Sequence, residues 1–171
     1  IFGFSAIAMA KLGAVGATFV FLSRFFMGEW YILLLFGLMA VGFYLMWKRD
    51  IPFFFKRQLV GIYFIVLAIL LSSHIILFEN LSSNNGFVQR SVLLNTWEIF
   101  WMELEGSASA TDLGGGMIGA VLYAVFHFLF ADAGSKFVSF LLIIAGLILI
   151  TGKGVSESLG KMLTSIGRFF I

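Results

Sequence analysis

The sequence predicts an all-α integral membrane fold, with four transmembrane helices and glycine-rich interfacial or re-entrant helices on the outer side. The first observation is composition: 61% of the 171 residues are hydrophobic and only 12% are charged, whereas soluble domains carry about 25% charged residues. The second is a series of apolar stretches that approach the roughly 20 residues needed to cross a bilayer. The third is the separation of basic loops from acidic loops, which orients these stretches.

The apolar stretch at the start of the chain is interrupted by Lys11 and Arg24. If 1–22 were one span, Lys11 would lie near the bilayer centre, at a cost of about 2.5–3.5 kcal/mol. We therefore expect a truncated span over about 1–12 and an outer helix over about 13–27. Because residue 1 is an isoleucine inside an apolar run, the chain is also expected to lack its native N-terminus.

Two further spans are expected over 30–47 and 58–78, with a basic loop between them. Tryptophans bracket the first of these spans, as interfacial anchors do. The loop carries Asp50 and four basic residues, Lys48, Arg49, Lys56 and Arg57. Basic residues in a short loop mark the cytoplasmic side of a membrane.

The charges of the remaining loops complete the orientation. The segment 79–113 is acidic, which places it outside, and the tail 153–171 is basic, which places it in the cytoplasm. We assign 1–152 to a polytopic membrane domain and 153–171 to a cytoplasmic tail. Both termini are then cytoplasmic in a multi-pass membrane protein.

Two apolar stretches, about 114–131 and 136–152, follow the acidic segment, but the chain can return to the cytoplasm through only one of them. The stretch 136–152 is uniformly aliphatic, whereas 114–131 opens with three glycines, which lower helix propensity by about 1 kcal/mol each. We expect 136–152 to span. The stretch 114–131 is expected to stay on the outer side, and the sequence leaves open whether it is re-entrant or lies on the surface.

The acidic segment contains a predicted amphipathic helix over about 91–105. Its apolar face holds Leu93, Trp97, Phe100 and Leu104, while Asn95, Glu98 and Glu105 lie elsewhere. This pattern is typical of a helix lying on a membrane surface.

Small residues mark candidate helix contacts. The string GAVGA at 13–17 is echoed by GMIGA at 116–120, which suggests two related halves, although chance in a glycine-rich chain also explains so short an echo. The candidate packing or oligomerisation residues are Gly13, Gly16, Gly115, Gly116, Gly119, Ala120 and Ala124. Such residues let helices approach closely in lipid, either within one chain, which is the commoner case, or between subunits.

The sequence contains no residue pattern typical of a catalytic, metal-binding or nucleotide-binding site. Without cysteine there is no disulfide or thiolate chemistry, and no catalytic triad, metal cluster or nucleotide-binding fingerprint is present. We therefore predict no catalytic, metal-binding or cofactor-binding residue in this region. His127 is expected to be a hydrogen-bonded interface histidine rather than a proton relay, and His74 likewise.

Three strings carry a specific resemblance: "FLSRFFMGEWYILLLFGL", "NTWEIFWMELEGSASATDLGGGMIGAVLYAVFHFLFADAGS" and "SIGRFF". They resemble the N-terminal membrane domain of the FtsK/SpoIIIE family of bacterial DNA translocases, nearest the SpoIIIE type of Gram-positive bacteria. The resemblance covers essentially the whole chain.

The resemblance implies a membrane anchor and septum-targeting domain for a hexameric, ATP-driven motor that moves double-stranded DNA in chromosome segregation, cell division and sporulation. The motor, with its ATP and magnesium, would follow a linker after Ile171. Implied partners are membrane lipids, further copies of the chain, division-septum proteins and, through the motor, double-stranded DNA.

A small polytopic transporter or channel subunit is the alternative, with the glycine-rich segments lining a pore. The lack of acidic residues within the spans argues against ion coupling. Whether an FtsK-type domain would form a DNA channel or only an anchor is a related question. The nearly uncharged spans and the acidic outer segment favour the anchor, because DNA binding relies on basic residues.

Overall fold

The computed structural model describes residues 1–83, 91–105 and 112–152, and this part of the chain is helical without β-strands. Three stretches are long and apolar enough to cross a membrane: Gly13–Lys48, Arg57–Leu81 and Gly116–Thr151. Apolar helices suit lipid because they satisfy their backbone hydrogen bonds internally. The stretches Gly13–Lys48 and Gly116–Thr151 each contain a sharp change of backbone direction, so each is built from more than one straight helix.

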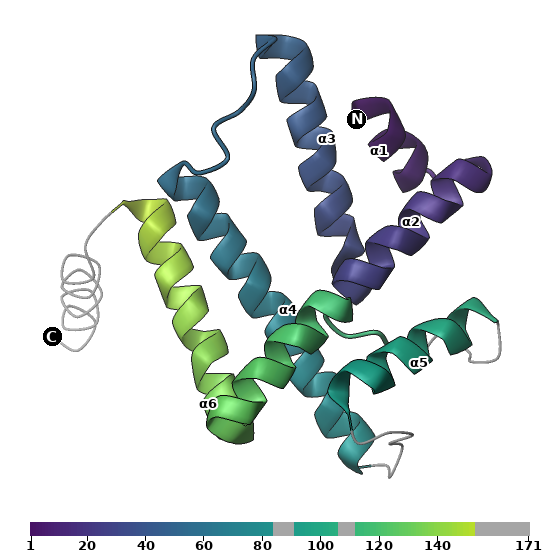
Figure 1. Ribbon diagram of the computed structural model, residues 1–171. Helices are drawn as coiled ribbons and strands as arrows, with labels where there is room; N and C mark the ends of the chain where they lie inside the picture. Colours follow the sequence, from purple (N-terminus) through teal and green to yellow (C-terminus); the bar gives the residue numbers. More distant parts are fainter. Residues whose placement is uncertain (84–90, 106–111, 153–171) are drawn as a thin grey trace, which may run out of the picture.

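The first half of the chain forms a three-helix unit. Helix α1 (Phe2–Met9) leads into α2 (Gly13–Met27), and a short 3₁₀ turn, η1 (Gly28–Trp30), connects α2 to α3 (Tyr31–Lys48). Gly28 has a φ of 58° and ends α2. Figure 1 shows α1 lying beside α3 while α2 runs obliquely between the two halves of the molecule.

Close approach of backbones holds this unit together. A Cβ at Gly42 of α3 would lie 2.6 Å from the Phe2 backbone nitrogen, and one at Gly16 would lie 2.7 Å from the Ile7 carbonyl oxygen. Ala8, Val20 and Leu35 form the buried cluster at the centre. Small residues therefore set the spacing of all three helices.

The second half is built on the pairing of α4 (Arg57–Ser83) with α6 (Gly116–Thr151). At Ala131 the backbone of α6 leaves the helical region, with φ 56° and ψ −170°. Figure 1 shows α6 descending obliquely from the centre of the molecule, turning sharply, and running back beside α4. The portion before this bend is called α6 proximal (116–130), and the portion after it α6 distal (132–151).

Small and hydroxylated residues line the contact between α4 and α6 distal. Gly61 and Gly146 face each other, so that a Cβ at Gly146 would lie 2.7 Å from the Gly61 carbonyl oxygen. The Ser72 and Ser139 hydroxyls are 2.6 Å apart, and Ser139 also donates to the Ala68 carbonyl oxygen at 3.1 Å. Interhelical hydrogen bonds and close packing are the main adhesive forces between helices in lipid.

Helix α5 (Val92–Leu104) lies against α6 and completes the second half. The main core joins α4, α5 and α6 around Leu71, Ile75, Phe78 and Tyr123. Large apolar side chains elsewhere are widely exposed, among them Phe36, Phe43, Phe128 and Phe140. Such exposure suits a protein whose surrounding solvent is lipid.

Candidate helix-packing site

The two halves of the molecule meet where the end of α2 touches the start of α6. The Glu29 amide donates a hydrogen bond to the Gly114 carbonyl oxygen at 3.1 Å. A Cβ at Gly28 would collide with that carbonyl, and a Cβ at Gly116 would lie 2.8 Å from the Phe26 carbonyl oxygen. We call Gly28, Gly114 and Gly116 the glycine junction. A larger side chain at Gly28 or Gly116 would force the two segments apart, whereas one at Gly114 would meet Leu77 and Ser73 of α4.

The start of α6 also packs directly on α4. A Cβ at Gly119 would lie 2.9 Å from the Leu70 carbonyl oxygen, and one at Gly115 would collide with the same carbonyl. Ala120 is fully buried, and Ala124 is half-buried. The predicted small-residue face of 114–131 is therefore used for packing within the chain, and its use between subunits stays a prediction.

The two echoed glycine strings adopt related geometries. Gly13 begins α2 with φ 62°, and Gly116 begins α6 with φ 61°. Three residues later, Gly16 packs on the Ile7 carbonyl and Gly119 packs on the Leu70 carbonyl. Each string thus starts an oblique helix and packs it on an earlier helix of the same half, α2 on α1 and α6 on α4. Gly13 itself has no atom within 4 Å of a Cβ position, so its role is conformational and differs from the predicted packing role.

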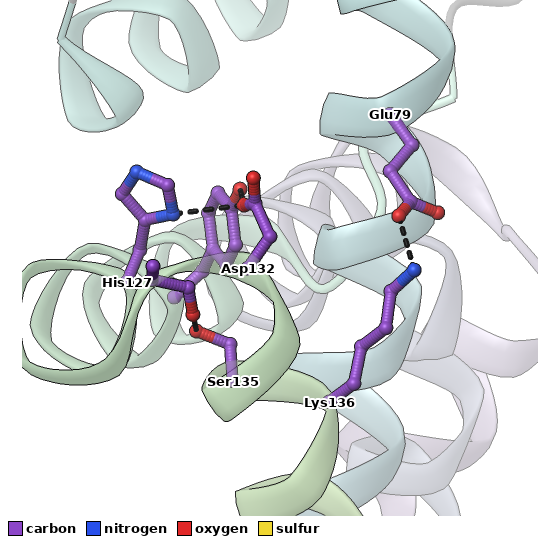
Figure 2. A network of polar contacts seen from close by, with 7 residues as sticks. Glu79, His127, Asp132, Ser135 and Lys136 are labelled. Atoms are coloured by element: carbon purple, nitrogen blue, oxygen red, sulfur yellow. Dashed lines mark hydrogen bonds and ion pairs between the residues drawn. The ribbon is translucent and has the colours of Figure 1, made fainter.

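A polar network surrounds the bend in α6 (Figure 2). The Tyr123 hydroxyl donates to Asp132 Oδ1 at 2.8 Å, and His127 Nδ1 lies 2.9 Å from the same oxygen. Close by, Lys136 forms an ion pair with Glu79 of α4. These contacts join α6 proximal to α6 distal and α6 distal to α4. His127 is a partner in this network, and nothing in its half-exposed setting marks a buried proton path.

His74 of α4 is the most deeply enclosed ionisable side chain among the described residues of the second half. It is fully buried, with its Nε2 at 3.4 Å from the Thr96 hydroxyl of α5. The rings of Phe78 and Tyr123 lie 5.4 Å and 5.9 Å from its ring. This setting matches the hydrogen-bonded interface histidine expected from the sequence. The contact between His74 and Thr96 joins α5 to α4.

Helix α5 presents a face that matches the predicted one only in part. Phe100 is only 5% exposed, and it packs against Phe21 and Phe25 of α2 with ring centroids 4.5 Å and 4.9 Å away. It therefore contacts protein where a membrane-surface contact was expected. Asn95 and Thr96 are buried too, because the polar side of α5 faces the core.

The remaining predicted residues of this helix have mixed positions. Leu93 and Trp97 are 38% and 43% exposed, which leaves them free to meet lipid, although Trp97 also stacks edge-on against Phe25. Leu104 ends α5, and its side chain lies outside the described residues. The exposed side of α5 is apolar, and it also carries Leu94 and Trp101.

The four basic topology residues lie where the sequence places them in the chain, around the loop between α3 and α4. Lys48 ends α3, Arg49 follows in the left-handed conformation, and Arg57 begins α4. All four are exposed. The tail 153–171 lies outside the described residues.

Sequence reasoning missed several residues that hold the structure together. Gly28, Gly114 and Asp132 were not singled out, because their roles depend on contacts between segments distant in sequence. The run of three glycines that begins at Gly114 was a visible signal, but its partner at Gly28 was not. Within the described ranges, no three histidine or carboxylate side chains gather as a metal site would require.

The fold and these contacts define a polytopic helical membrane domain, held together by small residues and interhelical hydrogen bonds. The chain is 48% identical over 165 residues to the DNA translocase SpoIIIE of Bacillus subtilis strain 168, which covers 96% of this chain and 21% of that protein. It is 48% identical over 157 residues to the DNA translocase FtsK of Halalkalibacterium halodurans, covering 92% of this chain and 20% of that protein. With the DNA translocase FtsK of Bacillus cereus it shares 40% identity over 168 residues, or 98% of this chain and 21% of that protein.

No family model matches the chain, and no solved structure matches it. The relatives nevertheless confirm the resemblance read from the sequence. The chain is homologous to the N-terminal region of the FtsK/SpoIIIE family of DNA translocases. It spans about a fifth of the length of these relatives. The alternative of a small transporter or channel subunit is not supported.

Proposed function

We propose that this chain is the membrane anchor and septum-targeting domain of an ATP-driven translocase of double-stranded DNA. The observation that carries the proposal is the 48% identity over nearly the whole chain to a protein named as a DNA translocase. Chromosome segregation, cell division and sporulation are the proposed settings. Because the chain covers about a fifth of that relative, the motor, with its ATP and magnesium, is assigned to the remainder.

The proposed topology has four spans with both termini in the cytoplasm. Helices α3 and α4 and α6 distal are the full spans: 18 residues in α3 give about 27 Å at 1.5 Å per residue, close to the roughly 30 Å hydrocarbon core. Helix α1 belongs to the first span. Helices α2, α5 and α6 proximal are placed at the outer side, which is supported by the bend at Ala131.

Assembly is proposed to follow the motor. A hexameric motor would gather six copies of this domain, and contacts with division-septum proteins would hold them at the septum. The domain acts as an anchor and does not form a DNA channel, a view supported by the nearly uncharged α3 and α4 interiors, since DNA passage requires basic surfaces. DNA is a partner only through the motor.

The full-length protein that contains this region provides the test. Deleting 1–152 should move the protein from the membrane fraction to the soluble fraction and disperse a fluorescent fusion from the septum. DNA-stimulated ATP hydrolysis by the purified deletion protein should persist. A deletion protein that stayed at the septum, or that lost ATPase activity while still folded, would contradict the anchor.

Topology needs a separate measurement. A fluorescent protein that matures only in the cytoplasm, attached after Ile171, should be bright. The same reporter inserted after Glu105 should be dark. The opposite pattern would overturn the proposed orientation without bearing on the anchor itself.

A further inference from the structure

The loop between α3 and α4 combines exposed aromatic side chains with exposed cations. We define the basic–aromatic loop as residues 47–57. Both helices that border it are apolar and among the stretches able to cross a membrane. The loop therefore lies where the ends of two neighbouring helices leave the hydrocarbon core.

The local backbone structure leaves the phenylalanine side chains of this loop exposed. Pro52 restricts the preceding residue to an extended conformation. The Lys56 amide then donates to the Phe53 carbonyl oxygen at 3.3 Å, which closes a turn over Phe54 and Phe55. Phe53 and Phe55 are 77% and 88% exposed. Nothing in the described parts of the chain covers these rings.

The cations of the loop are exposed around the same turn. Lys48, Arg49, Lys56 and Arg57 form no ion pair with any described residue. The acidic residue among them, Asp50, has its Oδ1 occupied by the Ile51 amide at 2.8 Å. Arg57 lies beside Gly152 at the end of α6. The loop thus presents a surplus of positive charge next to apolar rings.

We infer that the basic–aromatic loop binds the headgroups of anionic phospholipids. Tryptophan, here the exposed Trp47, favours the interfacial layer of a bilayer, and exposed phenylalanines bury at the boundary between headgroups and acyl chains. Clustered basic residues beside a transmembrane helix favour anionic lipid phosphates. The exposed phenylalanines favour lipid over DNA as the ligand of this loop. They gain from insertion beneath the headgroups, whereas a DNA duplex admits such rings only by unstacking its bases, which costs free energy at each base step. The inference rests on the part of the proposed function that has α3 and α4 crossing the membrane.

Native mass spectrometry of the detergent-solubilised chain, titrated with phosphatidylglycerol or phosphatidylcholine, provides the test. The chain should retain phosphatidylglycerol at lower concentrations than phosphatidylcholine. The double variant K48Q/K56Q should weaken phosphatidylglycerol binding by roughly tenfold or more, because each cation near an anionic surface contributes about fivefold. The variant F53S/F55S should keep the preference but weaken binding of both lipids.

The matched control is K11Q, compared with K56Q: each removes one exposed positive charge that forms no ion pair with a described residue, and Lys11 lies outside the loop. K11Q should bind phosphatidylglycerol as the parent chain does. All substituted side chains are exposed, and circular dichroism should report unchanged helix content in each variant. Equal binding of the two lipids, or equal loss in K11Q and K56Q, would overturn the inference.

The same titration with a short DNA duplex tests whether the loop binds DNA in place of lipid. If the duplex binds the loop and phosphatidylglycerol does not, the surface is a DNA contact and the lipid inference is wrong. Failure of the anchor proposal gives a different signature. The deletion protein would stay at the septum while the isolated chain still bound phosphatidylglycerol through the loop.

Discussion

Ala131 has a backbone conformation that alanine rarely adopts. Its φ of 56° with ψ of −170° lies in a region used almost entirely by glycine. The neighbouring Tyr123–Asp132 and His127–Asp132 contacts hold the chain in this position. Strain at one residue is therefore offset by polar contacts on either side of the bend.

Replacing Ala131 with glycine should stabilise the protein. We expect the substitution to raise the free energy of unfolding by about 1 kcal/mol, because glycine reaches this conformation without steric strain. Ala133→Gly, two residues further into regular helix, should lower it by about 1 kcal/mol. Unfolding of both variants in detergent, followed by circular dichroism, measures the difference. Equal destabilisation would show that the bend is absent in the micelle.

At the scale of elements, α5 depends on its contacts with α2 and α4. Its inner side carries Phe100 and Thr96, which contact Phe21 and His74. Its outer side carries Leu94, which is 50% exposed. The helix should therefore tolerate changes on its outer side and fail when its inner side is truncated.

The variant Phe100→Ala tests this asymmetry. Truncating a buried phenylalanine costs about 3 kcal/mol or more through lost packing and the cavity left behind. We expect α5 to become sensitive to protease and the unfolding midpoint to fall. Leu94→Ala should change stability by less than about 1 kcal/mol, because its side chain is half-exposed. If the two variants behaved alike, the packing of α5 on α2 would be refuted.

If the bend in α6 holds in the membrane, both ends of α6 proximal should lie on the outer side. The chain has no native cysteine, so single cysteines can be introduced at exposed Glu105 and Ala133, before and after α6 proximal. A membrane-impermeant thiol reagent added to intact cells should label both positions, because α6 proximal is proposed to stay outside. A cysteine at Phe55 should be labelled only after the membrane is opened. Labelling of the Ala133→Cys variant only after the membrane is opened would mean that α6 proximal crosses the bilayer.

At the scale of the whole molecule, the glycine junction joins two helical units. The first unit packs around Ala8, Val20 and Leu35, and the second around Leu71 and Tyr123. Between them lie the Glu29–Gly114 hydrogen bond and the Phe100 contacts with α2. The relative position of the units therefore depends on a few small residues.

A single methyl group at the junction should separate the units. Gly28→Ala would place its Cβ into the Gly114 carbonyl and impose a positive φ on alanine. We expect a loss of more than about 2 kcal/mol in the free energy of unfolding. The control is Gly37→Ala in α3, where no atom lies within 4 Å of a Cβ, and it should be neutral or raise stability by up to about 1 kcal/mol. Comparable melting curves for the two variants would contradict the junction.

The sequence by itself determined the helical class and the approximate elements. Apolar stretches near the length of a bilayer leave helices as the only way to satisfy backbone groups in lipid. Lys11 and the basic loop between the spans 30–47 and 58–78 marked breaks between helices, and the homology was readable from three strings of residues. Charge in the loops gave an orientation that stays a prediction.

Only the tertiary structure decided which faces these helices use. Phe100 was expected at the membrane surface but lies against Phe21, because α2 covers that side of α5. Asp132 gained its role from a bend that brings Tyr123 and His127 to it. The pairing of Gly28 with Gly114 joins residues far apart in sequence. In lipid, hydrophobicity does not distinguish an inner face from an outer one, so contacts between small residues fix the arrangement, and those contacts exist only once the helices have packed.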